Sequence, residues 1–163
     1  MTFLRQRKTL SKNLKRTITK GTVLSKNYSK HSMSVEASTK HLAKVRDFVA
    51  KYATEYGFKK QDVADIRLAV DEAYTNIIKH SYKYDDQKSV DIELGCNDDE
   101  FWVSLLDVGE SFDPSNYSEP DVRRQIKNKK RGGVGVYLIK KLMDEVKYLN
   151  DGDTNEIRMT KKR

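Results

Sequence analysis

Two side chains with complementary chemistry lie four residues apart in a segment of helical character. Glu72 offers a carboxylate that can take up a proton, and Asn76 offers a neutral carbonyl oxygen suited to Mg²⁺ beside phosphate oxygens. Residues at this spacing project from one side of a helix, and His80 continues the row. The row borders an apolar stripe through Ala73 and Ile77, where a cleft can form. An ordinary polar helix flank has the same spacing, so the row alone does not define a site.

A second candidate is Asp107, which ends an alternating apolar segment and is followed by Gly109. A buried carboxylate is costly without a hydrogen-bond donor, and an exocyclic amine such as that of adenine would supply one. Gly109 permits a sharp turn and the close approach of a flat ring. The pattern Asp-x-Gly is common in proteins, and the Asp113-Pro114 pair that follows is also typical of a plain turn.

The third candidate is a glycine-rich segment, Gly132, Gly133 and Gly135, just before a helical pattern. Glycines remove Cβ atoms where the backbone must approach a ligand, and a helix N-terminus has free N–H groups and a partial positive charge. This combination suits a phosphate, and Arg131 adds charge beside it. The segment matches neither the dinucleotide fingerprint nor the P-loop spacing. A flexible hinge would have the same composition.

Alternating and helical patterns predict the elements that must position these residues. Antiparallel strands joined mostly by hairpins, with three helices, favour an α+β two-layer sandwich with the helices on one face of the sheet. The longest helix spans residues 59–84, and a turn at Asp151-Gly152 joins the last two strands. The other predicted elements are a first strand at residues 32–38, helices at 39–56 and 133–143, and strands at 89–96, 101–108, 145–150 and 155–160.

The charge is unevenly placed along the chain. Residues 1–30 contain nine Lys and Arg and no acidic residue, so the net charge of +8 leaves 8 − 9 = −1 for the rest. We therefore predict a basic, mobile extension at residues 1–31 and one domain at 32–163. A docking arm for an acidic partner, nucleic acid or anionic lipid, or a transit peptide, would share the composition of the extension.

The remaining composition excludes several classes of protein. The single cysteine, Cys96, excludes an internal disulfide and a thiolate metal cluster, and it fits a reducing compartment. No apolar run approaches the roughly 18 residues that span a bilayer. The charged start lacks the apolar core of a secretory signal. These features predict a cytoplasmic protein without a membrane partner.

Taken in order, the three candidates resemble the GHKL ATPase superfamily and, within it, the anti-sigma-factor serine/threonine kinases of bacterial partner-switching systems. The similarity extends from about Ser32 to Lys161. DEAYTNIIKHSY (71–82) resembles the N box of the family, DVGESFDP (107–114) its adenine loop, and RGGVGVYLIKKLMDEVKY (131–148) its ATP lid and following helix.

The resemblance implies a Bergerat-type site for ATP and Mg²⁺. In such a site Asn76 holds Mg²⁺ and Glu72 is the general base toward the acceptor hydroxyl. Asp107 reads the adenine amine and Gly109 shapes that wall. The lid and last strand contribute the remaining residues: Gly132, Gly133 and Gly135 around the phosphates, Arg131 at the γ-phosphate, and Thr160 supporting adenine through a water.

The function implied by the resemblance is phosphoryl transfer from Mg-ATP to a Ser or Thr of a small anti-sigma-factor antagonist. It also implies that the kinase sequesters a sigma factor and forms a homodimer through its first strand and helix. A nucleotide-dependent binding module without transfer, acting on another target, is the alternative. A detached histidine-kinase domain would need an acceptor histidine, and neither His31 nor His41 has a suitable setting. Direct nucleic-acid binding would depend on the basic extension alone.

Overall fold

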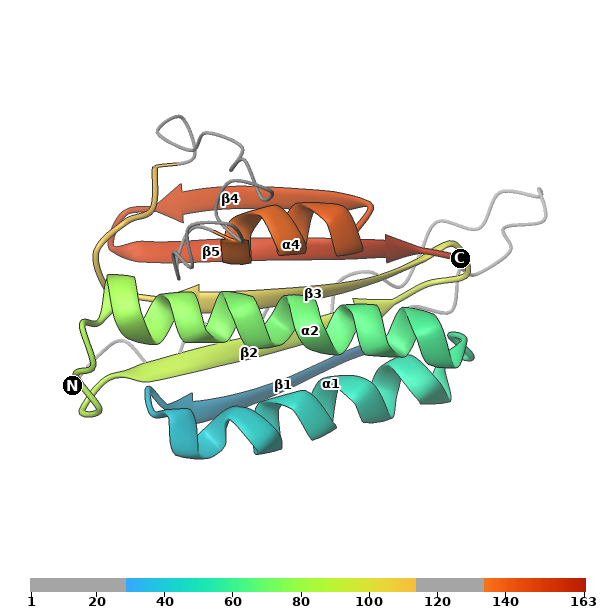
Figure 1. Cartoon of the computed structure of the whole chain (residues 1–163), viewed down its shortest axis with the longest axis horizontal. Helices are drawn as coiled ribbons and strands as arrows, with labels where there is room; N and C mark the ends of the chain where they lie inside the picture. Colours follow the sequence, from blue (N-terminus) through green and yellow to red (C-terminus); the bar gives the residue numbers. More distant parts are fainter. Residues whose placement is uncertain (1–28, 114–133) are drawn as a thin grey trace, which may run out of the picture.

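A single antiparallel sheet of five strands forms one layer of the domain. The computed structural model describes residues 29–113 and 134–163. The strands lie in the order β1-β2-β3-β5-β4, so the last hairpin inserts β5 beside β3 and leaves β1 and β4 at the edges (Figure 1). The strands are β1 (Ser29–Glu36), β2 (Ser89–Cys96), β3 (Glu100–Asp107), β4 (Glu145–Asp151) and β5 (Thr154–Lys162).

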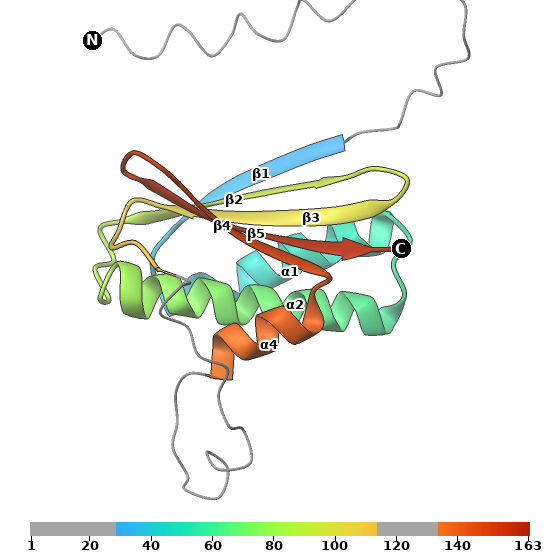
Figure 2. The same cartoon turned by 90° about the horizontal axis from the view of Figure 1, so that it is seen from above.

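The second layer consists of helices that cover one face of the sheet. In Figure 2, α1 (Leu42–Glu55), α2 (Lys60–Asn76) and α4 (Val134–Leu142) all lie on the same side of the strands. A short 3-10 turn, η1 (Thr39–His41), precedes α1, and the Ser38 side chain caps it by accepting from the Lys40 amide. The predicted α+β sandwich with helices on one face is therefore confirmed.

The core lies between the two layers because both contribute an apolar face. Alternate residues of β3, Phe101, Val103 and Leu105, are fully buried on the helix side. Along α2, Ile66 and Val70 continue the apolar stripe of Ala73 and Ile77 toward the start of the helix, and both are fully buried. By the same alternation, Asp107 is on the helix-covered side of the sheet, at the end of β3.

The predicted helix over residues 59–84 does not continue as one α-helix. It ends as α2 at Asn76, and the chain then forms a π turn, η2 (Ile77–Ser81). The amide of Tyr82 donates to the carbonyl of Ile77 at 3.0 Å, an i to i−5 bond. Such turns shift the side chains that follow them and are frequent at functional sites. His80 lies within this turn and is exposed, whereas Glu72 and Asn76 are half-buried.

Two predicted boundaries differ from the structure. The first strand begins at Ser29 instead of residue 32, because Ser29 to His31 pair with Cys96 to Leu94 of β2. The last hairpin turns at Gly152-Asp153 instead of Asp151-Gly152, because Asp151 is already paired with Thr154. Both differences arise from pairing register, which local sequence does not reveal.

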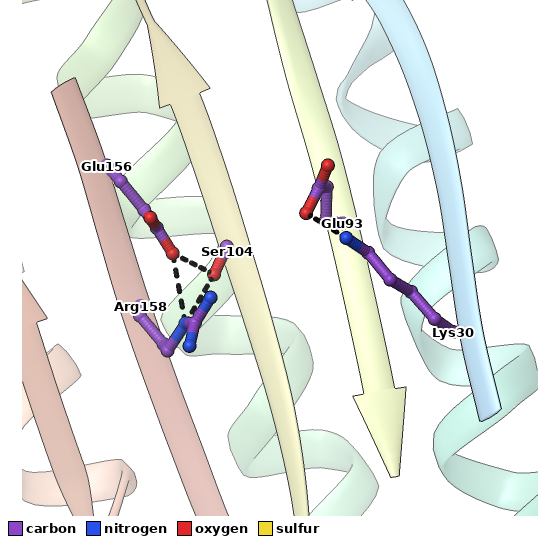
Figure 3. Close-up of polar contacts among 5 residues, drawn as sticks. All are labelled: Lys30, Glu93, Ser104, Glu156 and Arg158. Atoms are coloured by element: carbon purple, nitrogen blue, oxygen red, sulfur yellow. Dashed lines mark hydrogen bonds and ion pairs between the residues drawn. The ribbon is translucent and has the colours of Figure 1, made fainter. Parts of the chain in front are cut away.

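No helix of the described residues covers the other face of the sheet, which is lined by paired charges (Figure 2 and Figure 3). Arg158 Nε lies 3.0 Å from both Ser104 Oγ and Glu156 Oε1, and these two oxygens are 2.6 Å apart. Lys30 and Glu93 form an ion pair at 2.8 Å between β1 and β2. Antiparallel sheets tolerate one polar, solvated face of this kind.

None of the helices within residues 29–113 and 134–163 is long and apolar enough to cross a membrane.

Candidate functional site

Asp107 is the centre of one end of the candidate site. Its side chain is 6% exposed, and its Oδ1 accepts from the Gly109 amide at 2.8 Å and from Asn155 Nδ2 at 3.0 Å. No residue in the described part of the chain donates to Oδ2 of Asp107. An ionised carboxylate only accepts hydrogen bonds, so this second oxygen is suited to an amine of a ligand.

The loop after Asp107 is held tightly against the end of the long helix. The carbonyl of Ser81 accepts from the Glu110 amide at 2.9 Å, and a Cβ on Gly109 would lie only 2.4 Å from that oxygen. Tyr82 Oη accepts from the Val108 amide at 2.9 Å. Only glycine permits this approach of two backbones, so the predicted role of Gly109 in shaping this wall has a clear steric basis.

Tyr82 ties the same loop to the sheet. Its hydroxyl donates to the Ser89 carbonyl at 2.7 Å while it accepts from Val108. Burial raises the pKa of Tyr82, with a smaller opposing effect from the bond to Val108. The hydroxyl is therefore a permanent donor and acceptor. It holds in place, without a ligand, the end of the site around Asp107 and Gly109, which is predicted to hold adenine and is called the base end below.

Glu72, Asn76 and Gly135 form the other end of the candidate site. A Cβ on Gly135 would lie 2.7 Å from Glu72 Oε2 and 3.3 Å from Asn76 Nδ2, so the start of α4 directly faces both side chains. Glu72 and Asn76 are half-buried, and neither has a hydrogen bond or ion pair within residues 29–113 and 134–163. Half-buried polar groups left unpaired are candidates for contacts with a ligand.

The neighbouring carboxylate, Asp71, has a different role. Its Oδ2 lies 2.5 Å from an Nη of Arg46 and its Oδ1 accepts from Arg46 Nε at 3.1 Å, which joins α2 to α1. The hydrogen bond and charge of Asp71 raise the pKa of Arg46. Asp71 therefore anchors the helix, whereas the adjacent Glu72 remains available for chemistry.

The described residues fit a magnesium–nucleotide better than a metal held by protein alone. No group of three or more His, Cys, Asp or Glu capable of holding a metal occurs among them. Mg²⁺ commonly takes one or two protein ligands and otherwise binds phosphate and water. The amide of Asn76 beside the N-terminus of α4, with room opened by Gly135, matches that mode.

The structure brings five of the predicted site residues into two groups, Asp107 with Gly109, and Glu72 with Asn76 and Gly135. Arg131, Gly132 and Gly133 lie outside the described residues.

Thr160 is not brought to the base end. It pairs with Trp102 in β3, whereas Asp107 pairs with Asn155, five residues earlier in β5. Alternation also places Thr160 on the sheet face without helices, together with Glu156 and Arg158.

The residue of β5 that contacts Asp107 is Asn155, which the sequence pattern did not single out. Asn155 has the same parity as the core residues Ile157 and Met159, so the pattern assigns it to the helix side. Its contact with Asp107 depends on the register between β3 and β5. The sequence signal is thus limited to a polar residue on an inward-facing position at the start of the last strand.

Comparisons with known proteins identify the family and the fold. The model of the histidine kinase-like ATPase domain family matches residues 35–161. Serine-protein kinase RsbW of Bacillus cereus is 31% identical over 128 residues, covering 76% of this chain and 79% of that protein. RsbW of Bacillus thuringiensis subsp. konkukian has the same identity and coverage. The structure of the RsbU and RsbW domains of Rv1364c from Mycobacterium tuberculosis shares the fold, with a TM-score of 0.59, 17% identity, and coverage of 83% of this chain and 33% of that one.

The chain belongs to the histidine kinase-like ATPase domain family and, within it, to the GHKL anti-sigma-factor kinases. It is an ATP-binding protein serine/threonine kinase of the partner-switching type.

Proposed function

We propose that this kinase phosphorylates a Ser or Thr of a small anti-sigma-factor antagonist and, when free of it, sequesters a sigma factor. One observation carries the proposal: the carboxylate of Glu72 is unpaired within the described residues, half-buried, and directly beside Asn76 and Gly135. A base for an incoming hydroxyl needs these properties together with proximity to the phosphate.

Glu72 is proposed to accept the proton of the acceptor hydroxyl as the oxygen attacks the γ-phosphorus. Asn76 and the backbone at the start of α4, with Gly132, Gly133 and Gly135, would hold the metal–phosphate group, and Arg131 would contact the γ-phosphate. Asp107 and Gly109 would hold adenine at the far end of the site. Mg²⁺, when bound, supplies neutralisation of the charge that spreads over the transferring phosphoryl group.

The assembly around this site is also proposed. The kinase domain would comprise β1 to β5 with their helices, and the basic residues before Ser29 would be an extension not needed for transfer. A homodimer acting in the cytoplasm would bind either the antagonist or the sigma factor. The similarity to RsbW kinases supports this assignment of partners.

The test is phosphoryl transfer with purified components. We expect radiolabelled ATP and the cognate antagonist to give phosphoserine or phosphothreonine on the antagonist. Glu72→Gln is expected to lower the transfer rate by about 10²–10⁴-fold and to change ADP affinity little, because only proton transfer is lost. Asp62→Asn, which removes a carboxylate from the first turn of the same helix, should leave transfer unchanged.

Two outcomes would contradict the proposal. Tight binding of Mg-ATP and a partner without any labelled product would show a nucleotide-dependent binding module instead of a kinase acting on that partner. Full transfer by Glu72→Gln would remove Glu72 from the role of base.

A further inference from the structure

Asn155 uses every hydrogen-bonding position of its side chain. Its Nδ2 donates to Asp107 Oδ1 and to the Gly109 carbonyl, each at 3.0 Å. Its Oδ1 accepts from Ser111 Oγ at 2.7 Å and from Asn150 Nδ2 at 2.9 Å. An amide has two N–H donors and an oxygen with two lone pairs, so this set saturates Asn155.

These partners also determine the orientation of the amide. A backbone carbonyl and an ionised carboxylate only accept, so the group that faces Gly109 O and Asp107 Oδ1 must be the NH₂ of Asn155. The reversed amide would put its oxygen against both acceptors and leave its NH₂ facing the NH₂ of Asn150. Asn155 therefore has one stable orientation, with both donors directed at the adenine loop.

As a consequence, the two oxygens of Asp107 differ in their hydrogen bonding. Oδ1 already accepts from Gly109 and Asn155, whereas Oδ2 has no donor within the described residues. We propose that Asn155 is a positioning residue for base recognition, which holds Oδ1 of Asp107 and leaves Oδ2 as the single acceptor for a base carrying an exocyclic amine. This inference rests on the proposed nucleotide site.

A carboxylate that offers only Oδ2 to a ligand distinguishes purines by the group that they carry at position 6. Adenine has an amine at position 6 that donates to Oδ2, and hypoxanthine has a carbonyl there that would face a carboxylate oxygen. A site built to bind an N–H group rejects the analogue that lacks it, because the buried acceptor then has no partner. A carboxylate free to rotate would discriminate less, and Asn155 prevents that rotation.

The variant Asn155→Asp tests this role, because a residue that only stabilised the fold would not give ADP binding that depends on pH in the way described here. The substitution removes both donors and places a second carboxylate at hydrogen-bond distance from Asp107. Two carboxylates so close bind one proton between them as the pH falls, and the introduced carboxyl group, once protonated, can again donate to Oδ1. We expect ADP binding to be about 10–100-fold weaker than wild type at pH 8, with most of that loss recovered at pH 6.

The other titratable and polar groups that the structure describes around the Asp107 loop do not explain this pH dependence. Tyr82, from the helix end, has a raised pKa and stays neutral through this range. Lys83 lowers the pKa of Glu110, its partner at 2.6 Å, so Glu110 stays ionised. Asn150 of β4 is neutral, and the pair of Glu156 with Arg158 lies on the opposite sheet face. The ratio of wild-type to variant affinity also cancels the titration of the phosphates of ADP.

The experiment measures binding of ADP and inosine diphosphate to the full chain by calorimetry at pH 6 and pH 8. Asn150→Ala is the matched control: it removes one bond to Asn155 without touching Asp107, and we expect less than about a threefold change at either pH. Asn155→Ala should lower the preference for ADP over inosine diphosphate by about tenfold at both pH values.

The outcomes separate this inference from the kinase assignment. Wild-type binding of ADP together with weak, pH-independent binding by Asn155→Asp, or with binding equal to wild type, would overturn the role of Asn155 and leave the nucleotide site standing. Failure of the wild-type chain to bind any adenine nucleotide would remove the site and this inference with it.

Discussion

The two ends of the candidate site are built differently. At the base end, Asp107, Gly109 and Tyr82 are joined by hydrogen bonds to the helix end and to two strands. At the phosphate end, Glu72 and Asn76 have no partner within the described residues, although both are half-buried. Within the described residues, the hydrogen bonds of the base end leave only Asp107 Oδ2 for a ligand, whereas the phosphate end has two polar side chains without a partner.

The difference indicates which properties each end determines. Rigid, saturated groups favour selectivity, because a wrong ligand cannot be accommodated by movement. Unpaired carboxylate and amide groups favour chemistry, because they remain free to accept a proton or a metal. We therefore expect changes at the base end to affect stability and affinity together, and changes at the phosphate end to affect transfer alone.

The largest effect is expected from Gly109→Ala. The new Cβ would lie 2.4 Å from the Ser81 carbonyl oxygen, and a backbone group cannot rotate away as a side chain can. The loop must shift, which should cost about 1–3 kcal/mol of unfolding free energy and weaken ADP binding markedly. Denaturant unfolding and calorimetry measure both. Val108→Ala, at a neighbour that is 57% exposed, is the control and should change neither.

Gly135→Ala tests the phosphate end in the same way. Its Cβ would lie 2.7 Å from Glu72 Oε2, the far end of a flexible side chain that can turn aside. We expect a loss of roughly 10-fold or more in transfer rate, with little change in melting temperature, because Glu72, the proposed base, is displaced without distortion of the core. A large drop in melting temperature with an unaltered rate would contradict the proposed division between the two ends.

Tyr82→Phe removes the hydroxyl that links the adenine loop to β2. The Val108 amide and the Ser89 carbonyl would lose their partner, which should lower the unfolding free energy by about 1–2 kcal/mol. Chemical denaturation checks this value. Tyr84→Phe, at a ring that is 64% exposed, is a matched control, and an equal loss there would show that the bonds of Tyr82 contribute nothing special.

The smallest effect is expected at the ion pair of Lys83 with Glu110. The hydrogen bond and charge of Lys83 lower the pKa of Glu110, so the pair stabilises the fold above the unfolded-state pKa and this contribution is lost as the pH falls through the folded-state pKa. Both side chains are mostly exposed, so Lys83→Ala should lower the melting temperature only slightly at pH 7 and not at all near pH 3. Thermal scans at the two pH values decide this.

Local pattern was sufficient to predict much of this molecule. The stripe through Ile66 and Val70 is buried in α2, and the alternation of Phe101, Val103 and Leu105 forms the buried side of β3. The spacing of Glu72 and Asn76 correctly indicated a shared helix side, because both lie before the helix changes pitch. The predicted row does not extend to His80, which is exposed, because no local sequence feature indicates that the α-helix becomes a π turn at Ile77.

The contacts across the sheet could not be predicted in this way. The sequence resemblance predicts Thr160 as the residue of the last strand that supports adenine, whereas the residue that contacts Asp107 is Asn155. The difference depends on which residue of β5 pairs with Asp107. A shift of register changes every partner in a strand while it leaves the strand pattern intact. The start of β1 at Ser29 was missed for the same reason, since it depends on pairing with Cys96.

Neighbours along the chain set the periodicities, the inward and outward faces, and the order of the three chemical segments, so all of these could be read without coordinates. Three contacts required the folded chain: Gly135 faces Glu72, Gly109 touches Ser81, and Asn155 donates to one oxygen of Asp107. The physical reason is that each of these contacts joins elements far apart in sequence, whose distance is set by sheet register and helix packing.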